Sequence, residues 1–232
     1  MHPKQHSTLH RMGVYCKHFA LGFALICAQL TLSSASAQTS EPSAETFRYT
    51  KALLEQADSA YNKGDFQQAI RDYTQAIALN PNNAGLYGLR GLAYYDFKDY
   101  SSAIRDFNQA IALNPNDAGL YASRGNAYGN LKDYSSAIRD YNQAIALNPN
   151  DAYAYGNRGV IYSKLKDYSS AIRDLTQSIA LGRNDANVYY NRAASFADKK
   201  DYRSATRDAR KACSLGDCRA LEFLGNNGWL RD

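Results

Sequence analysis

The chain is built on a repeat of 34 residues. The segment DYSSAIRDFNQAIALNPND at 99–117 recurs almost unchanged at 133–151, and again as DYSSAIRDLTQSIALGRND at 167–185. A period of this length indicates a supersecondary unit that must stack on its neighbours, because one unit alone cannot bury its apolar face. The period therefore predicts a stacked-repeat architecture. It divides the chain into five repeats: 50–83, 84–117, 118–151, 152–185 and 186–219.

Each repeat reads as two helices. With the positions of a repeat numbered 1 to 34, apolar residues follow helical spacing over positions 1–14 and 17–31. Proline lacks the amide proton that a helix interior needs, so the second helix should stop before Pro81, Pro115 and Pro149. An aspartate precedes most of the predicted helices, where an N-cap oxygen is required. The sequence therefore predicts an all-α fold.

Small and aromatic residues recur at fixed positions of the repeat. Glycine stands at position 8 (Gly91, Gly125, Gly159), alanine at position 20 (Ala103, Ala137, Ala171), and tyrosine at position 4. In this pattern the chain resembles the tetratricopeptide repeat (TPR) family over residues 50–219. The resemblance implies a right-handed superhelical solenoid of five helix-turn-helix repeats. Residues 220–232 would form a short C-terminal cap, and the atypical first and last repeats fit the ends of such a stack.

One face of the first helix varies between repeats. The second and third repeats agree at 27 of 34 positions, and most differences lie on that face. The resemblance implies that this face lines a concave groove that binds a partner. The candidate groove residues are Tyr95, Asn126, Asn130, Tyr153, Asn157 and Tyr190. Asparagine can donate to and accept from a peptide bond, and tyrosine offers rigid apolar area with a polar tip.

Two limits apply to the predicted groove. The Lys/Asn clamp with which chaperone-binding TPR domains hold a C-terminal carboxylate is absent, and the varying face could simply be the small, polar exposed side of a solenoid. If it is a groove, Asn126→Ala should weaken partner capture and change the melting temperature little, whereas Gly125→Leu should overpack the contact with Ala137.

Arginine at position 7 and aspartate at position 23 suggest ion pairs. The first repeat has Gln56 in place of the arginine, so pairing within a repeat would leave its aspartate without a partner. We therefore expect each aspartate to pair with the arginine of the next repeat; the alternative is solvated charges worth ~0–1 kcal/mol each. The expected pairs are Asp72–Arg90, Asp106–Arg124, Asp140–Arg158 and Asp174–Arg192.

A second row of arginines, at position 22, has a different interpretation. Each member is followed directly by the position-23 aspartate, which favours a solvated face over a docking site for an anionic surface. The row is Arg71, Arg105, Arg139, Arg173 and Arg207.

The first 37 residues read as a secretory signal peptide. Basic residues precede an apolar stretch at 19–32, and the small residues Ala35, Ser36 and Ala37 precede Gln38. Fourteen apolar residues are too few to span a bilayer, which takes about 20, although an uncleaved N-terminal anchor is the alternative. Translation from Met1 or from Met12 would serve equally well. Residues 38–49 would be a linker and the start of the first helix, in a periplasmic or secreted protein.

Removing this leader changes the charge and the available chemistry. The formal charge of +5 includes three basic leader residues, and 24 basic residues then remain against 22 acidic ones, which is no footprint for nucleic acid. All four histidines precede residue 19. A Ser–His–Asp or Cys–His arrangement is then impossible, and no metal ligand set or cofactor motif is evident.

Two cysteines remain after cleavage, Cys213 and Cys218. In an oxidising compartment such a pair favours a structural disulfide, with Gly216 permitting the turn. Two free thiols are the alternative, and the C-x4-C spacing is not that of a redox motif.

These observations predict a non-enzymatic interaction scaffold or adaptor of the cell envelope, with a protein or peptide partner in the groove. The alternative is a structural protein that self-associates through its solenoid ends or convex face. A redox enzyme that uses Cys213 and Cys218 is a third reading. No cofactor, nucleic acid or stable membrane span is expected.

Overall fold

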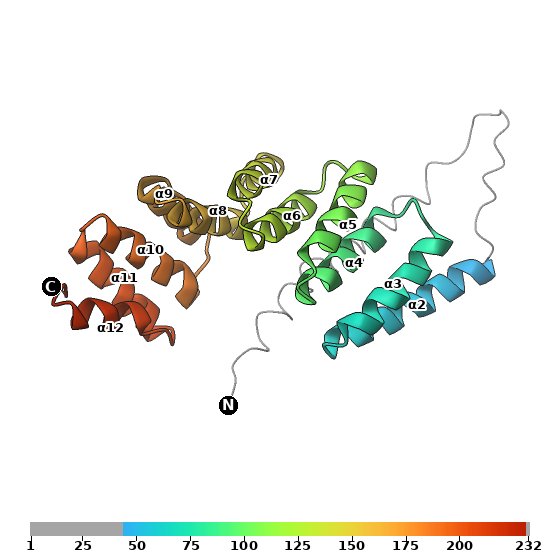
Figure 1. The fold of residues 1–232 in the computed structure, drawn as a ribbon, viewed down its shortest axis with the longest axis horizontal. Coiled ribbons are helices and arrows are strands. Elements are labelled where there is room, and N and C mark those ends of the chain that lie inside the picture. Colours follow the sequence, from blue (N-terminus) through green and yellow to red (C-terminus); the bar gives the residue numbers. More distant parts are fainter. Residues whose placement is uncertain (1–43, 231–232) are drawn as a thin grey trace. The chain divides into compact units, whose positions relative to one another are not determined.

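The computed structural model describes residues 44–230, and every regular element in that range is an α-helix (Figure 1). The predicted signal peptide and residues 38–43 lie outside the described residues. The helices are α2 (Ala44–Asn62), α3 (Phe66–Leu79), α4 (Ala84–Asp96), α5 (Tyr100–Leu113), α6 (Ala118–Asn130), α7 (Tyr134–Leu147), α8 (Ala152–Lys164), α9 (Tyr168–Ala180), α10 (Ala186–Asp198), α11 (Tyr202–Ser214) and α12 (Arg219–Asn226).

Local signals in the sequence set the helix ends. The Asp99 carboxylate caps α5 by accepting from the backbone N–H of Ser102 at 3.0 Å, and Asp65, Asp133, Asp167 and Asp201 cap the equivalent helices in the same way. In the second and third repeats the helices occupy positions 1–13 and 17–30. The predicted bounds are therefore confirmed to within one residue there.

The turn between the two helices of a repeat requires a left-handed residue at position 15. The first repeat places Gly64 there with φ of 80°, whereas the other four place a lysine with φ between 62° and 69° (Lys98, Lys132, Lys166 and Lys200). A residue with a Cβ is strained in this region, where glycine is not. Four of the five turns therefore carry a residue that is locally unfavourable.

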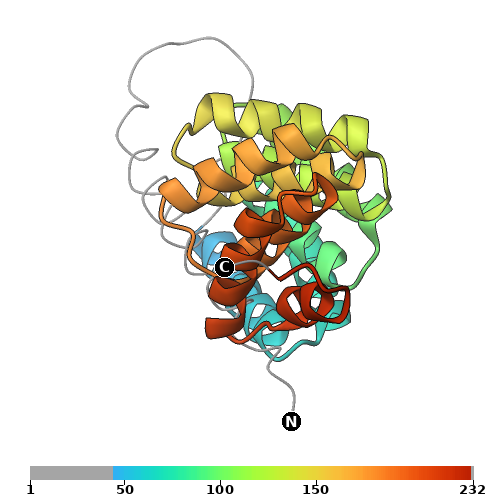
Figure 2. The same cartoon turned by 90° about the vertical axis from the view of Figure 1, so that its left-hand side faces the viewer.

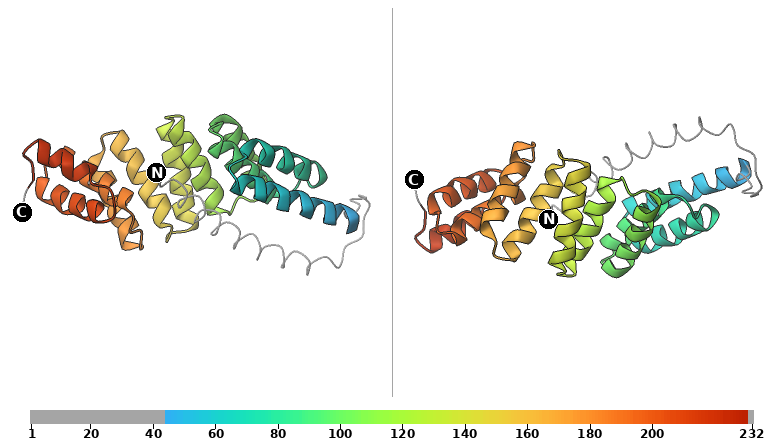
Figure 3. Two further views of the ribbon diagram at one scale, coloured as in Figure 1. Left: turned by 90° about the horizontal axis from the view of Figure 1, so that it is seen from below. Right: turned by 90° about the horizontal axis from the view of Figure 1, so that it is seen from above.

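The described helices fall into two compact units. The first ends at Asn114 and contains α2 to α5, in which α2 packs on α3, α3 on α4, and α4 on α5. The second begins at Pro115 and contains the pairs α6–α7, α8–α9 and α10–α11. Within the second unit α6 also contacts α8, and α8 contacts α10, so the first helices of its repeats lie side by side (Figure 3).

Small residues let the two helices of a repeat approach closely. A Cβ added at Gly125 would lie 3.1 Å from Cε1 of Tyr141 and 3.3 Å from the carbonyl oxygen of Ala137. Ala137 is fully buried. The predicted contact between positions 8 and 20 is confirmed in this repeat.

The C-terminal segment packs on the last repeat. Helix α12 contacts α11 and α10 (Figure 2), and its Leu224 is 1% exposed. Trp229 stacks on Tyr202 with ring centroids 4.9 Å apart, and Phe223 meets Trp229 edge-on. The predicted cap is therefore a helix followed by an aromatic cluster. Between residues 44 and 230 no helix has the length and apolar character needed to cross a bilayer.

Candidate functional site: the face formed by the first helices of the repeats

Ion pairs between half-buried arginines and buried aspartates hold the two helices of a repeat together, and they correct the predicted pairing. Nε and Nη2 of Arg90 donate to the two carboxylate oxygens of Asp106, both at 2.7 Å. The pairs Arg124–Asp140, Arg158–Asp174 and Arg192–Asp208 have the same two-pronged geometry, with contacts of 2.6–2.9 Å. Each pair lies within one repeat, so the predicted pairs Asp72–Arg90, Asp106–Arg124, Asp140–Arg158 and Asp174–Arg192 are wrong.

The premise of that prediction fails at Asp72. Nε2 of Gln68, one turn away on the same helix, donates to this carboxylate at 2.7 Å. Glutamine therefore supplies the partner that the first repeat lacks at position 7, and pairing within a repeat leaves no orphan there.

Arg90, Arg158 and Arg192 also join neighbouring repeats, through their third nitrogen. Nη1 of Arg90 donates to the Thr74 hydroxyl at 3.0 Å, and Nη1 of Arg158 donates to Oδ1 of Asn142 at 2.6 Å. Nη1 of Arg192 reaches the Thr176 hydroxyl at 3.1 Å. The hydrogen bond to Asp106 raises the pKa of Arg90, against the effect of burial. The guanidiniums of Arg90, Arg158 and Arg192 therefore each contact their own repeat and the preceding one.

A polar network centred on Asn126 joins α6 and α8. Its Oδ1 accepts from the Tyr141 hydroxyl at 2.7 Å and from Nδ2 of Asn157 at 2.8 Å. Tyr141 belongs to α7 and is 2% exposed, so Asn126 also satisfies a hydroxyl whose ring is buried. Asn126 and Asn157, both predicted groove residues, are therefore brought together, but Asn126 is also part of the scaffold.

The two accepted bonds fix the orientation of both amides. With Oδ1 of Asn126 engaged, its Nδ2 group has no hydrogen-bond partner among the described residues, and neither has Oδ1 of Asn157. No buried side-chain nitrogen or oxygen in the described range lacks a partner, so these two atoms reach solvent. The face therefore presents one amide donor and one amide acceptor on adjacent helices.

A pairing between positions 9 and 24 was missed by the sequence analysis. In the first repeat the Tyr73 hydroxyl donates to the Asp58 carboxylate at 2.6 Å, as Tyr141 does to Asn126. Where position 24 lacks a hydroxyl, position 9 is apolar, as in Leu92 with Phe107. The signal was present in the sequence as this correlated change between repeats.

The Asp58 carboxyl is a half-buried acid in this pairing. Burial raises the pKa of Asp58 above its ordinary value, and the hydrogen bond from Tyr73 acts in the opposite direction. The third repeat places the neutral Asn126 at the same position, where no such penalty arises.

The remaining predicted groove residues are half-buried or exposed. Tyr95, in the first unit, meets Tyr100 edge-on with centroids 5.4 Å apart. Nδ2 of Asn130 donates to the backbone carbonyl of Asn126 at 2.9 Å. Tyr153 is 51% exposed and Tyr190 is half-buried.

Two arginines that the sequence analysis did not place on this face cover its tyrosines. The Arg183 guanidinium lies 4.9 Å from the ring centroid of Tyr153, and the Arg219 guanidinium lies 4.4 Å from that of Tyr190. Arg183 comes from the loop after α9, where the fourth repeat lacks the proline. The tyrosines of the fourth and fifth repeats therefore present guanidinium-stacked rings.

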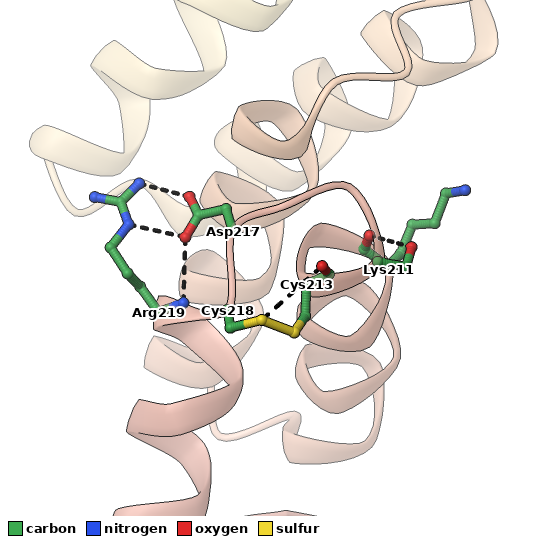
Figure 4. The surroundings of a disulfide bond; sticks show 6 residues. Lys211, Cys213, Asp217, Cys218 and Arg219 are labelled. Atoms are coloured by element: carbon green, nitrogen blue, oxygen red, sulfur yellow. Dashed lines mark hydrogen bonds and ion pairs between the residues drawn. A yellow bond between two sulfur atoms is a disulfide. The ribbon is translucent and has the colours of Figure 1, made fainter. Parts of the chain in front are cut away.

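The end of this face is tied to the C-terminal loop. The structure joins Cys213 to Cys218 in a disulfide, which brackets the loop that carries Asp217 (Figure 4). Asp217 accepts from Nε and Nη2 of Arg219 at 2.9 and 2.6 Å, and so orients the arginine that covers Tyr190. No cluster of three or more potential metal-ligating residues occurs in the described part of the chain.

Comparison with known proteins agrees with this architecture. Three family models of the tetratricopeptide repeat match residues 54–118, 107–139 and 125–194. This chain belongs to the tetratricopeptide repeat family. Among curated proteins, serine/threonine-protein phosphatase 5 of Rattus norvegicus is 47% identical over 55 residues, which are 23% of this chain and 11% of the phosphatase. The chain thus spans about a tenth of that enzyme's length.

Solved structures share the TPR fold over most of the chain. A crystal structure of MamA is 25% identical with a TM-score of 0.64, and the match covers 78% of this chain and 96% of MamA. PilF of Pseudomonas aeruginosa is 16% identical with a TM-score of 0.68, covering 80% of this chain and 88% of PilF. YrrB, described as a TPR protein with an unusual peptide-binding site, is 20% identical with a TM-score of 0.61, covering 77% of this chain and 97% of YrrB.

Proposed function

We propose that this TPR protein is a non-enzymatic scaffold that binds an extended segment of a protein partner on the first-helix face of its second unit. The observation that carries the proposal is the oriented pair of amides on α6 and α8. The Nδ2 group of Asn126 can donate to a peptide carbonyl, and Oδ1 of Asn157 can accept from a peptide N–H. Membership of the TPR family and the exposed Tyr153 beside this pair support the same face.

Site-specific photo-crosslinking in intact cells tests this proposal. A photoreactive amino acid in place of Tyr153 should give discrete adducts, and Asn157→Ala should reduce them. The matched control is the same probe at Gln143, an exposed position on α7, which lies on the other helix layer of the second unit. Equal adducts from both positions, or adducts from Tyr153 that Asn157→Ala leaves unchanged, would move the binding surface elsewhere.

Self-association is the competing role. Light scattering on the purified chain separates the two: the scaffold proposal expects a monomer whose mass does not rise with concentration. A mass that rises with protein concentration would favour the structural role. So would photo-crosslinked adducts that disappear when the protein is diluted.

We also propose that the protein is exported and acts in the cell envelope. The support is the basic and apolar leader ahead of Ala35, Ser36 and Ala37, together with a cysteine pair that can form a disulfide only where thiols are oxidised. N-terminal sequencing of the protein from the cells that produce it should begin at Gln38. A full-length product in the cytosol, with Cys213 and Cys218 reduced, would exclude this compartment.

A further inference from the structure

Burial of the position-23 aspartates changes the charge of the second-helix face. Asp140, Asp174 and Asp208 are 2–4% exposed, and each is held by the position-7 arginine of its repeat. The arginines that precede them in sequence, Arg139, Arg173 and Arg207, are exposed. Arg207 keeps one long contact with its neighbour, 3.8 Å from Nε to Oδ1 of Asp208, while its side chain is 70% exposed. The interpretation of position 22 as a neutral, solvated face rested on these aspartates, which belong to the interior instead.

Helix α11 adds three cations to this row. Positions 18, 25 and 26 carry Ser169, Thr176 and Gln177 in α9, and the matching residues of α7 are also uncharged. In α11 the same positions carry Arg203, Arg210 and Lys211. With Arg207 these residues fall within an arc of about 100° of the helix surface, opposite the buried alanines 205, 209 and 212.

Position 25 shows why an arginine fits only in the last repeat. In repeats followed by another within their unit, this residue accepts from the next arginine, as Thr74, Asn142 and Thr176 do. A cation there would meet that guanidinium. Helix α12 follows α11 in place of another such first helix, so Arg210 is compatible with the fold.

The charge is concentrated in the second unit. Between residues 44 and 114 there are 7 basic and 8 acidic residues, whereas between 115 and 230 there are 16 basic and 12 acidic ones. Helix α11 alone has four cations and one acid, the buried Asp208. Within α11 no large apolar residue is among the exposed ones, so the face lacks the apolar centre typical of a protein interface.

From this arrangement we propose that the exposed face of α11 docks the protein on a bilayer that contains anionic phospholipid. A dense layer of phosphate headgroups attracts long, flexible cationic side chains without requiring a shaped or apolar contact. Arg203, Arg207, Arg210 and Lys211 are exposed on one arc of α11. The Lys211 ammonium also lies 5.9 Å from the ring centroid of Tyr189. The first-helix face of the unit belongs to the other helix layer, so this docking is independent of partner binding there.

Vesicle co-sedimentation tests the proposal. The sample is the protein purified from the cells that produce it, in the form that remains after any processing there. The variant Arg203→Ser, Arg210→Thr, Lys211→Gln installs the residues of α9 and should keep the fold, which circular dichroism checks. We expect binding to vesicles of 70% phosphatidylcholine and 30% phosphatidylglycerol, lost in 0.5 M NaCl and weakened on the order of 100-fold in the variant. Pure phosphatidylcholine vesicles measure any contribution that is independent of charge.

A control variant of equal charge makes the test specific. Lys98→Gly, Lys132→Gly and Lys166→Gly also remove three cations, and each installs the residue that the first repeat has at that turn. This control should retain most of the binding. Equal losses in both variants, unchanged binding of the α11 variant, or an absence of binding to the anionic vesicles would each overturn the proposal. So would preferential binding of duplex DNA that the vesicles do not displace.

Discussion

At the scale of single residues, the structure shows that a side chain on the candidate binding face can also support the core. Asn126 accepts from the buried Tyr141 and from the neighbouring Asn157. Positions 9 and 24 therefore change together between repeats, with polar pairs where a tyrosine hydroxyl must be satisfied and apolar pairs elsewhere. The expectation that Asn126→Ala would change the melting temperature little is revised accordingly, because this substitution removes the amide oxygen that accepts from the Tyr141 hydroxyl.

The first prediction is a double-mutant cycle at this pair. Asn126→Leu should destabilise the protein by about 1–3 kcal/mol, because the Tyr141 hydroxyl loses its acceptor. Adding Tyr141→Phe reproduces the Leu92–Phe107 pair of the second repeat and should recover much of that loss. Urea unfolding followed by circular dichroism measures both changes; strictly additive effects would show that the two positions are not coupled.

The second prediction concerns the charge of Asp58. Because burial raises its pKa in the folded state, the ionised carboxylate costs stability above the folded pKa, and the cost vanishes below the unfolded value of about 3.9. Asp58→Asn, which copies the third repeat, should therefore raise the free energy of unfolding at pH 7. The gain should shrink as the pH falls toward 4. A gain that grows on acidification would mean that the pKa is lowered.

At the scale of helices and turns, the repeats use one backbone design with unequal quality. Aspartate caps recur at the start of each second helix, but the preceding turn has glycine once and lysine four times in the left-handed region. At the C-terminus, a disulfide and a helix close the stack instead of a sixth repeat. Both features lead to stability changes that can be measured without any ligand.

The third prediction concerns the lysine turns. Replacing Lys132 by glycine removes the Cβ strain of the left-handed conformation, which costs ~1–2 kcal/mol in the folded state. It also makes the unfolded chain more flexible, which destabilises the folded state by ~0.5–1 kcal/mol. Changing any one of the four lysines to glycine should therefore raise the free energy of unfolding by on the order of 0.5 kcal/mol. Lys132→Ala is the matched control, since it removes the charge and keeps the Cβ. If alanine stabilises as much as glycine, the gain comes from charge and not from backbone strain.

The fourth prediction concerns the C-terminal disulfide. Changing both Cys213 and Cys218 to serine opens a short loop and should cost about 2 kcal/mol, confined to the cap. Trp229 is the single tryptophan and stacks on Tyr202, so its fluorescence reports the cap directly. In the variant its transition should precede the loss of helical circular dichroism. Coincident transitions would show that the cap and the repeats unfold as one.

At the scale of the whole molecule, much of the described fold follows from the sequence because its signals are local. Caps, prolines and the 34-residue period place helices to within one residue in the regular repeats. The Arg–Asp pairing was predicted wrongly because a recurring position does not say which of two stacked neighbours lies closer. Gln68, one turn before Asp72 on the same helix, supplies the partner that the prediction sought in a neighbouring repeat. The contacts of Asn126 and of Arg183 likewise depend on helix packing and loop path, which the period does not encode.

The central claim is that the amide pair on α6 and α8 binds a protein partner, and a paired measurement of affinity and stability on Asn157→Ala tests it most directly. For the partner identified by crosslinking, the dissociation constant should rise about tenfold, as expected for one lost hydrogen-bonding group. The melting temperature should stay within about 2 °C, since Tyr141 still donates to Asn126. The control Gln143→Ala should alter neither quantity. An unchanged dissociation constant, or one that rises only because the variant unfolds, would contradict the account.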